Sequence, residues 1–335
     1  MSVGIRDVAR AAGVSTATVS RALGRGPVSD ALREQVEAAV RATGYRPNLS
    51  ARRLRSQSTQ TIGLIVADIR NPFFTAVSRA VEDAAYQAGM RVILCNTDED
   101  ATREAMYLRL MQEERVTGVI FAPTRASAQG LRAADIDFPV VFIDRAGPPG
   151  AHDSVVLDNA AAASALVDHL VEEGFRRIGG LFGSTSSTAQ ERRAGYEAAM
   201  ARHGLAPAAR AVLPNAAAAE AEAGRWLAEA GRPEALILSN GLILMGALRA
   251  ARAHALPVPG ALALAGFDNE PWTDLVDPGL TVIEQPVAEI GAQAMTLLFD
   301  RLKAPDQPVR KVVLSGRPVL RGSTRRGAPG SGARA

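Results

Sequence analysis

The chain has 335 residues, which exceeds the usual size of one domain and predicts two or three folding units. Hydrophobic residues make up 47% and charged residues 22% of the chain. These are ordinary values for a soluble globular protein, and no apolar run reaches the roughly 20 residues of a membrane helix. The single cysteine, Cys95, excludes an intrachain disulfide framework and a thiolate cluster for structural zinc.

The first residues argue against export. Arg6, Asp7 and Arg10 stand where a secretory signal would have an uninterrupted apolar stretch. We therefore expect a cytoplasmic protein with no membrane partner.

Charge is distributed unevenly along the chain. Residues 1–58 contain ten arginines and four acidic residues, a net charge of +6, whereas the remainder has 28 basic and 31 acidic residues, a net charge of −3. A basic segment on a mildly acidic body favours a polyanionic partner, because phosphate neutralisation releases counterions. A solvated arginine-rich surface is the alternative explanation of this pattern.

Two short helical patterns separated by a glycine open the chain. The first ends at Gly13, and the second begins at Val14 and Ser15. The apolar residues that recur with helical spacing are Ile5, Val8, Ala9 and Ala12, then Val19, Ala22 and Leu23. The pattern predicts a helix, a tight turn and a second helix.

A third helix is predicted to begin at Ser29, whose hydroxyl can cap it, and to end at Gly44. The second helix leaves Thr16, Ala17, Ser20 and Arg21 facing outward. Short side chains and one arginine fit the major groove of DNA.

The headpiece resembles that of the lac repressor (LacI/GalR) family of transcriptional regulators. The segments that carry this resemblance are residues 5–9 (IRDVA), 12–21 (AGVSTATVSR) and 44–48 (GYRPN). The similarity continues in the body in residues 61–66 (TIGLIV), 71–74 (NPFF), 266–269 (GFDN) and 285–286 (QP). It covers residues 4 to about 325.

The resemblance implies a small all-α helix-turn-helix headpiece and an α/β core of two doubly wound lobes, similar to periplasmic sugar-binding proteins. It places the DNA-binding domain in residues 1–46, a hinge in 47–58 and the effector-binding and dimerisation core in 59–325. Lobe 1 is expected to comprise about 59–158 and 287–316, and lobe 2 about 159–286 and 317–325. Residues 326–335 have few apolar side chains and are expected to be disordered.

The function that the resemblance implies is sequence-specific DNA binding by a homodimer, as a repressor of transcription under allosteric control. The partners would be a pseudo-palindromic double-stranded operator and a small effector. The headpiece residues expected to contact DNA are Ser15, Thr16, Ala17, Thr18, Ser20 and Arg21.

The hinge is too short to form a stable isolated helix in water, so it should fold only when held. In the family, paired hinges lie in the minor groove, and a leucine that matches Leu54 wedges into the central base step. The hinge residues expected to contact DNA are Asn48, Ala51, Arg52 and Leu54. The alternative is a flexible basic linker.

Beyond residue 60, short apolar runs alternate with helical segments, as parallel sheets covered on both faces require. The predicted strands are residues 62–66, 92–95, 119–122, 140–143, 178–182, 236–238 and 262–265. The resemblance predicts that the chain crosses between lobes near residues 157–160, 284–287 and 316–318, with the effector in the cleft between the lobes.

Effector-binding residues are expected where strands end, because ligands of open α/β sheets bind at the carboxyl ends of strands. Phe73 and Phe74 follow the first strand, and one ring could stack on a sugar or base, although such a pair is as often core. Arg145 ends another strand, and Asp158 falls at the first crossover.

Three further residues match effector contacts of the family. Arg192 matches a clamping arginine, and its guanidinium suits vicinal hydroxyls or a carboxylate; a surface charge is the alternative, for which its neighbour Arg193 is better suited. Asn240 and Asp268 follow strands, and Asp268 could instead cap the next helix.

The chain departs from the commoner family pattern at two positions. Gly241 stands where an aspartate usually follows the asparagine, and Asn215 where an aromatic often gives a second stacking face. These departures weaken the assignment of any particular sugar. Because Arg145 and Arg192 can donate and Asp268 can accept hydrogen bonds, the effector is expected to be a sugar, sugar acid or polyol, with a purine as the alternative.

Other classes of function are disfavoured by the residues. No nucleophile elbow, phosphate-binding loop or zinc-protease motif occurs, and the four histidines lie in separate segments. We expect no enzymatic activity, no metal and no cofactor. A sugar-binding receptor with a basic N-terminal extension is the alternative from another class, and it requires secretion.

Overall fold

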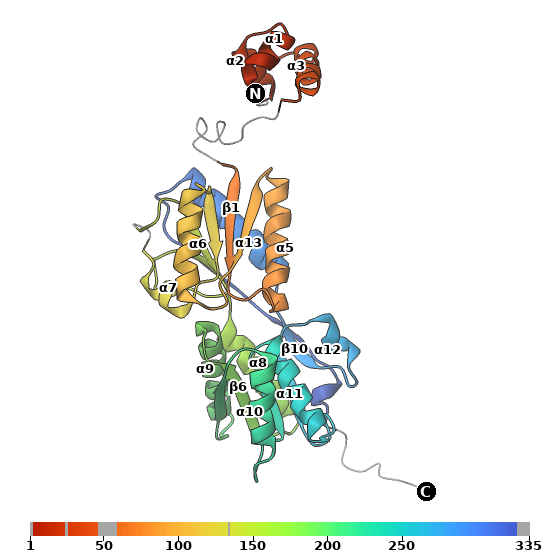
Figure 1. The fold of residues 1–335 in the computed structure, drawn as a ribbon. Coiled ribbons are helices and arrows are strands. Elements are labelled where there is room, and N and C mark those ends of the chain that lie inside the picture. The colour runs from red at the N-terminus through yellow and green to blue at the C-terminus, as the bar shows by residue number, and fades with distance from the viewer. Residues whose placement is uncertain (1–2, 24–25, 46–58, 133–134, 327–335) are drawn as a thin grey trace. The chain divides into compact units, whose positions relative to one another are not determined.

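The computed structural model describes residues 3–23, 26–45, 59–132 and 135–326 (Figure 1). The chain divides into two compact units, residues 1–59 and 60–335. The first contains a helical headpiece, and the second contains two six-stranded sheets with helices on both faces. The expected fold class is confirmed. Within the described ranges, no helix has the length and apolar character needed to cross a membrane.

The headpiece consists of α1 (Ile5–Ala11), α2 (Thr16–Leu23) and α3 (Asp30–Thr43). Gly13, in the turn between α1 and α2, has a φ of +61°, a left-handed conformation that favours glycine. The small buried core holds all three helices together. Its buried members are Val8, Ala9, Ala12, Val19, Ala22, Val36 and Ala39.

The ends of α3 agree only in part with the sequence-based expectation. Gly44 ends the helix in the left-handed conformation, as predicted. Ser29 stands at the N-cap, but its side chain makes no capping hydrogen bond, so that prediction was wrong. Two longer side chains of α3 instead reach the other helices: Arg33 Nη1 donates to the Ala22 carbonyl at 2.6 Å, and Gln35 Nε2 donates to the Ala12 carbonyl at 2.9 Å.

Lobe 1 of the core is a parallel sheet with the strand order β11-β5-β4-β3-β1-β2. Its strands are β1 (Thr61–Val66), β2 (Arg91–Asn96), β3 (Gly118–Phe121), β4 (Val140–Ile143), β5 (Asp153–Leu157) and β11 (Lys311–Leu314). Its helices are α5 (Pro72–Gln87), α6 (Ala101–Glu113), α7 (Arg125–Gly130) and α13 (Val287–Lys303). Helices α5 and α13 cover one face, and α6 lies on the other (Figure 1).

Lobe 2 repeats this arrangement with the order β12-β10-β9-β8-β6-β7, in which only the β10–β12 pair is antiparallel. Its strands are β6 (Ile178–Gly183), β7 (Ala208–Val212), β8 (Ala235–Leu238), β9 (Ala263–Phe267), β10 (Thr281–Glu284) and β12 (Arg317–Val319). Its helices are α8 (Asn159–Glu172), α9 (Ser187–Arg202), α10 (Ala216–Leu227), α11 (Gly241–Ala253), α12 (Pro271–Leu275) and the 3-10 turn η2 (Gly322–Thr324).

The chain passes between the two sheets three times: from β5 into α8, from β10 into α13, and from β11 into β12. Parallel strands within a sheet end at the same edge, and the loops after the strands of both lobes meet in one cleft. This topology therefore decides which loop residues can share a site.

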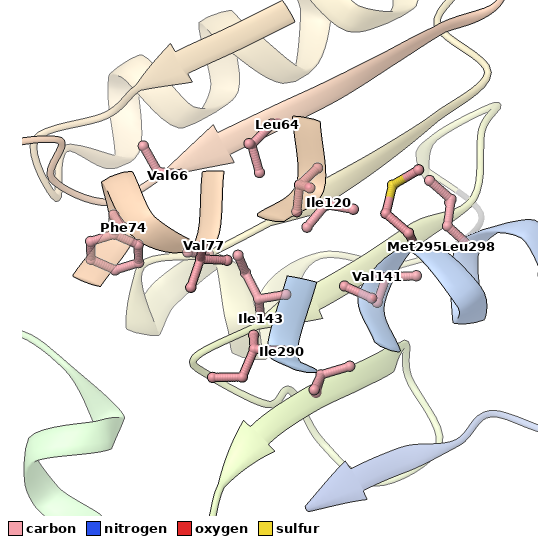
Figure 2. Close-up of a cluster of buried hydrophobic side chains, with 14 of the residues drawn as sticks. Leu64, Val66, Phe74, Val77, Ile120, Val141, Ile143, Ile290, Met295 and Leu298 are labelled. Atoms are coloured by element: carbon pink, nitrogen blue, oxygen red, sulfur yellow. The ribbon is translucent and has the colours of Figure 1, made fainter. Parts of the chain in front are cut away.

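Apolar side chains from strands and helices fill lobe 1 between the sheet and α5 with α13. Figure 2 shows Leu64 and Val66 of β1 near Phe74 and Val77 of α5, and Ile290 and Met295 of α13 on the same side. The buried aromatic ring of Phe74 belongs to this cluster. Core packing thus fixes the start of α5, which borders the cleft.

Helices α8 and α9 approach each other at backbone distance in lobe 2. A Cβ atom on Gly195 of α9 would lie 2.2 Å from the carbonyl oxygen of Ala160 in α8. Only glycine fits there, and the two helices are held in a fixed register.

Gly195→Ala should therefore lower the free energy of unfolding of the core by about 1–3 kcal/mol, because the methyl group has no room. Gly224→Ala in α10 is the matched control: its new Cβ would meet His254 Nε2 at 3.5 Å, and alanine is the better helix former by up to about 1 kcal/mol. Urea denaturation measures both. Equal effects of the two changes would contradict close packing at Gly195.

Candidate DNA-binding surface and effector site

Ser15 starts the second helix of the headpiece. Its Oγ accepts a hydrogen bond from Thr18 N at 3.1 Å and lies 2.9 Å from the Thr18 hydroxyl. An N-cap of this type satisfies a free N–H group of the first turn. Ser15 and Thr18, which are expected to contact DNA, therefore also stabilise the first turn of α2. This helix carries the other residues of the headpiece that are expected to contact DNA.

The remaining residues predicted on α2 lie at the surface. Thr16, Ala17, Ser20 and Arg21 are exposed, whereas Val19 and Ala22 are buried. Arg21 Nε donates to the Ala17 carbonyl at 3.4 Å, a long bond on an exposed side chain. The exposed face has short side chains and one arginine, which are compatible with a helix that enters the major groove. The hinge residues Asn48, Ala51, Arg52 and Leu54 lie outside the described residues.

A cleft between the two lobes contains most of the predicted effector residues. Its free volume is about 60 Å³, well below the roughly 300–1,000 Å³ of sites for drug-sized ligands, so the cleft is narrow in this conformation. The residues that line it are Asp68, Asn71, Phe73, Phe74, Glu99, Asp144, Arg145, Gly183, Thr185, Ser186, Thr188, Ala189, Arg192, Pro214, Ser239, Asn240, Asp268 and Gln285.

Phe73 and Phe74 belong both to the wall of the cleft and to the hydrophobic core. Phe73 and Phe74 line the cleft, yet both are buried members of the lobe 1 core. Their ring centroids lie 5.1 Å apart in an edge-to-face arrangement, a favourable geometry for aromatic pairs. Asn71 holds this turn, because its Oδ1 accepts from Phe73 N at 3.1 Å. The pair offers a rigid apolar wall.

Arg192 projects from α9 into the cleft and is buried, with 4% of its surface exposed. Its guanidinium stacks on the Phe267 ring at 3.9 Å, and Nη1 donates to the Ser239 carbonyl at 2.5 Å. Burial lowers the pKa of this guanidinium, against the attraction of Asp268 and Asp144. The neighbouring Arg193 is exposed and pairs with Glu197, so the surface-charge alternative applies to Arg193.

Asp268 and Asn240 lie on the lobe 2 side of the cleft. Asp268 Oδ2 accepts from Gly241 N at 2.8 Å, and Oδ1 accepts from Gln285 Nε2 at 2.6 Å. The carboxylate thus sits at the start of α11, where the helix dipole favours negative charge. It does not cap α12, the helix that follows, whose N-cap is Glu270. Asn240 caps α11 itself, with Oδ1 accepting from Ile243 N at 2.8 Å.

Arg145 lines the cleft but is already paired. It donates through Nη1 to Glu99 Oε2 at 2.9 Å and to the Pro123 carbonyl at 2.7 Å, and through Nη2 to Glu99 Oε1. Burial acts to lower the pKa of Arg145, but the bonds to Glu99 and the charge of Asp144 outweigh it and raise the pKa. Its guanidinium therefore holds the cleft wall together through three of its five N–H groups, while Nε has no hydrogen-bond partner among the described residues.

Asp144 of lobe 1 contacts Thr188 of lobe 2. Thr188 Oγ1 donates toward the Asp144 carboxylate and carbonyl, each at 3.3 Å. The backbone of Asp144 has a φ of +65°, which few residues other than glycine adopt. Burial raises the pKa of Asp144, while Arg145 and Arg192 oppose the shift. A strained, buried carboxylate at a cleft is typical of a functional position.

Asp158 is placed differently from its prediction. It is exposed, it is not among the residues that line the cleft, and its side chain caps α8 by accepting from Ala161 N at 3.0 Å. The next residue, Asn159, is buried and accepts from Arg192 Nε at 2.9 Å. Asn215 is exposed and is also not among the residues that line the cleft.

Sequence reasoning missed Glu99, Thr188 and Gln285 as cleft residues. Gln285 stands in a motif already noted for the family resemblance, at the second crossover. Glu99 follows β2, and the rule that loops after strands form the site could have found it. Thr188 lies in the first turn of α9, where no sequence signal separates it from Ser186 and Ser187.

The headpiece and the cleft together define a class: DNA-binding regulators in which a helix-turn-helix precedes a sensor core of periplasmic-binding type. The family described as "Bacterial regulatory proteins, lacI family" matches residues 4–48, and the "Periplasmic binding protein-like domain" matches residues 167–324.

Relatives match along nearly the whole chain. The HTH-type transcriptional regulator PtxS of Pseudomonas plecoglossicida is 36% identical over 96% of both chains. DegA of Bacillus subtilis, also an HTH-type transcriptional regulator, is 31% identical over 97% of this chain and 98% of its own. A solved lac repressor dimer, bound to operator and an anti-inducer, has a TM-score of 0.87 at 26% identity, over 97% and 99% of the two chains. The chain belongs to the lacI family and is a transcriptional regulator.

Arg145, which lines the cleft, and Arg70, which does not, differ in their expected contribution to stability. Arg145→Ala should lower the free energy of unfolding of the core by about 3–5 kcal/mol, because it leaves the Glu99 carboxylate unpaired in a largely buried position. Arg70→Ala is the control: Arg70 binds Asp68 with Nε at 2.8 Å, but its side chain is 71% exposed, and such pairs contribute less than about 1 kcal/mol. Urea denaturation measures the free energy of unfolding of both variants. Equal losses in the two variants would contradict a structural role of the Arg145–Glu99 pair.

Proposed function

We propose that the chain is a repressor that binds a pseudo-palindromic operator as a homodimer, and that a small hydroxyl-rich metabolite in the interlobe cleft controls its affinity for DNA. The observation that carries this proposal is a compact cleft, lined from both lobes by hydrogen-bonding groups, in a chain with a helix-turn-helix headpiece. The function requires binding and a change of conformation only. We propose no enzymatic activity, and the cytoplasm as the place of action.

Two solved structures of similar proteins support the proposal that operator DNA and a small molecule are the partners. One is described as a lac repressor dimer bound to operator and an anti-inducer, and another, with a TM-score of 0.73 and 25% identity, as a regulator in complex with cellobiose. Two-fold symmetry in the protein requires two half-sites in the DNA, about one helical turn or a multiple of it apart.

The charges of the cleft favour a neutral effector within the classes of sugar, sugar acid and polyol. Four carboxylates line it, from Asp68, Glu99, Asp144 and Asp268, against two arginines. One of the arginines, Arg145, is occupied by Glu99. Hydroxyl groups of a ligand can donate to the carboxylates, whereas an added carboxylate would meet like charges.

A purine is the second candidate ligand. The Phe73–Phe74 wall could take one face of a base, but Asn215, which is exposed and outside the lining set, gives no opposite aromatic face.

Arg21→Ala should reduce affinity for the specific operator by roughly 1–3 kcal/mol if its guanidinium contacts a base edge. Binding to scrambled DNA should change much less. The control is Arg41→Ala on α3, whose side chain is 72% exposed; it should show no preference between the two DNAs. Fluorescence anisotropy with an operator selected from random DNA, at two salt concentrations, measures all of these. Equal losses for Arg21→Ala on operator and scrambled DNA would assign Arg21 to phosphate contact.

Arg192→Ala and Asp268→Ala should abolish the effector response and leave operator binding without ligand within about threefold of wild type, because the headpiece core does not include them. Arg193→Ala is the matched control and should behave as wild type. The probes are D-glucose, D-ribose, D-glucitol, D-gluconate and hypoxanthine, tested by calorimetry and by operator anisotropy.

The outcomes separate the ligand classes. Tighter binding of D-glucitol than of D-gluconate supports the neutral class, and the reverse order overturns the charge argument. Binding of hypoxanthine alone makes the purine the effector. If wild type binds none of these compounds, the proposed effector class is wrong.

A further inference from the structure

Asn159 makes two hydrogen bonds inside lobe 2, one on each side of its carboxamide. Its Oδ1 accepts from Arg192 Nε at 2.9 Å, and its Nδ2 donates to Glu191 Oε2 at 2.8 Å. Asn159 is 2% exposed. A buried amide with both ends satisfied is rigidly held.

The chemistry of the two partners fixes the orientation of this amide. A guanidinium only donates and a carboxylate only accepts, so the oxygen must face Arg192 and the nitrogen must face Glu191. Alanine offers neither group, and an ionised aspartate offers no donor to Glu191. Among small side chains, asparagine alone bridges these two residues without a change in charge.

Other contacts leave one nitrogen of Arg192 for a ligand. Nε is bound by Asn159, Nη1 by the Ser239 carbonyl, and the plane of the guanidinium rests on Phe267. Nη2 has no hydrogen-bond partner among the residues that the structure describes, and Arg192 lines the cleft. The side chain is held in one orientation before a ligand arrives, which lowers the entropic cost of binding.

The position of Asn159 in the chain links this clamp to the first crossover between the lobes. Asn159 is the first residue of α8, directly after β5 of lobe 1 and the capping residue Asp158. Close packing of Gly195 against Ala160 keeps α9, and with it Arg192, at this distance from Asn159. The crossover and the ligand-facing guanidinium therefore share one rigid contact.

We propose that Asn159 is a positioning residue of the effector site: its carboxamide, anchored by Glu191, orients Arg192 toward the ligand. This inference rests on the proposed function for the ligand, but the orientation of Arg192 can be measured without one. Asn159 itself is absent from the residues that line the cleft.

The first test follows the Arg192 Nε–H resonance by nuclear magnetic resonance of the full-length protein, assigned by its loss in Arg192→Lys. In wild type this proton should exchange slowly with solvent, because it is buried and hydrogen-bonded. Asn159→Ala should speed the exchange by about tenfold or more, the size expected for one hydrogen bond to a charged group.

The second test is a reciprocal exchange of donor and acceptor. Asn159→Asp alone keeps an acceptor for Arg192 but repels Glu191, so the resonance should be perturbed. The double variant Asn159→Asp with Glu191→Gln restores the donor on the other side and should return the exchange rate to within about threefold of wild type. Glu191 is exposed, so its change should not disturb folding.

Calorimetry with D-glucose and D-glucitol gives the functional result on the same variants. Affinity should fall about tenfold in Asn159→Ala and recover in the double variant, with melting temperatures of the two alike. An unchanged Arg192 resonance in Asn159→Ala, or no recovery in the double variant, would overturn the proposal. If neither compound binds wild type, the effector class fails, while the resonance still decides the role of Asn159.

Discussion

The effector cleft depends on a buried positive charge. Removing a guanidinium from water costs several kcal/mol unless partners replace the lost hydration. Arg192 is 4% exposed, and its surroundings meet this requirement with an aromatic face, a backbone carbonyl and the amide of Asn159. These partners come from three separate segments of lobe 2, so the charge can exist there only when the lobe is fully folded.

The lobe 1 side of the cleft also contains a buried arginine, and its charge is compensated by acidic side chains. Arg145 is neutralised by Glu99 from the loop after β2 and lies beside Asp144, which in turn contacts Thr188 across the cleft. A hydrogen bond from a threonine to a buried carboxylate thus connects the two lobes at the place where a ligand would sit. A ligand that alters these contacts differently in two conformations of the core would shift their populations, which is what allosteric control requires.

The fold was largely predictable because its signals are local. The glycine between two short helical patterns, the exposed face of α2 and the apolar runs of the central strands all follow from residue type and spacing. Five strands were missed: β7, β11 and β12 lie at sheet edges and are partly exposed, whereas β5 and β10 are interior and largely buried.

The sequence could place Arg192, Asn240 and Asp268 near the cleft, because loops after parallel strands meet at one edge and because the family resemblance singles these positions out. Only the tertiary structure decided which side chains remain free. Arg145 is occupied by Glu99, 46 residues away, Asp158 turns to cap its own helix, and Asn159 beside it turns inward to Arg192. Asp158 and Asn159 are adjacent but have different partners, because packing of the folded chain brings distant residues next to one of them and not the other. Spacing along the sequence does not predict such contacts.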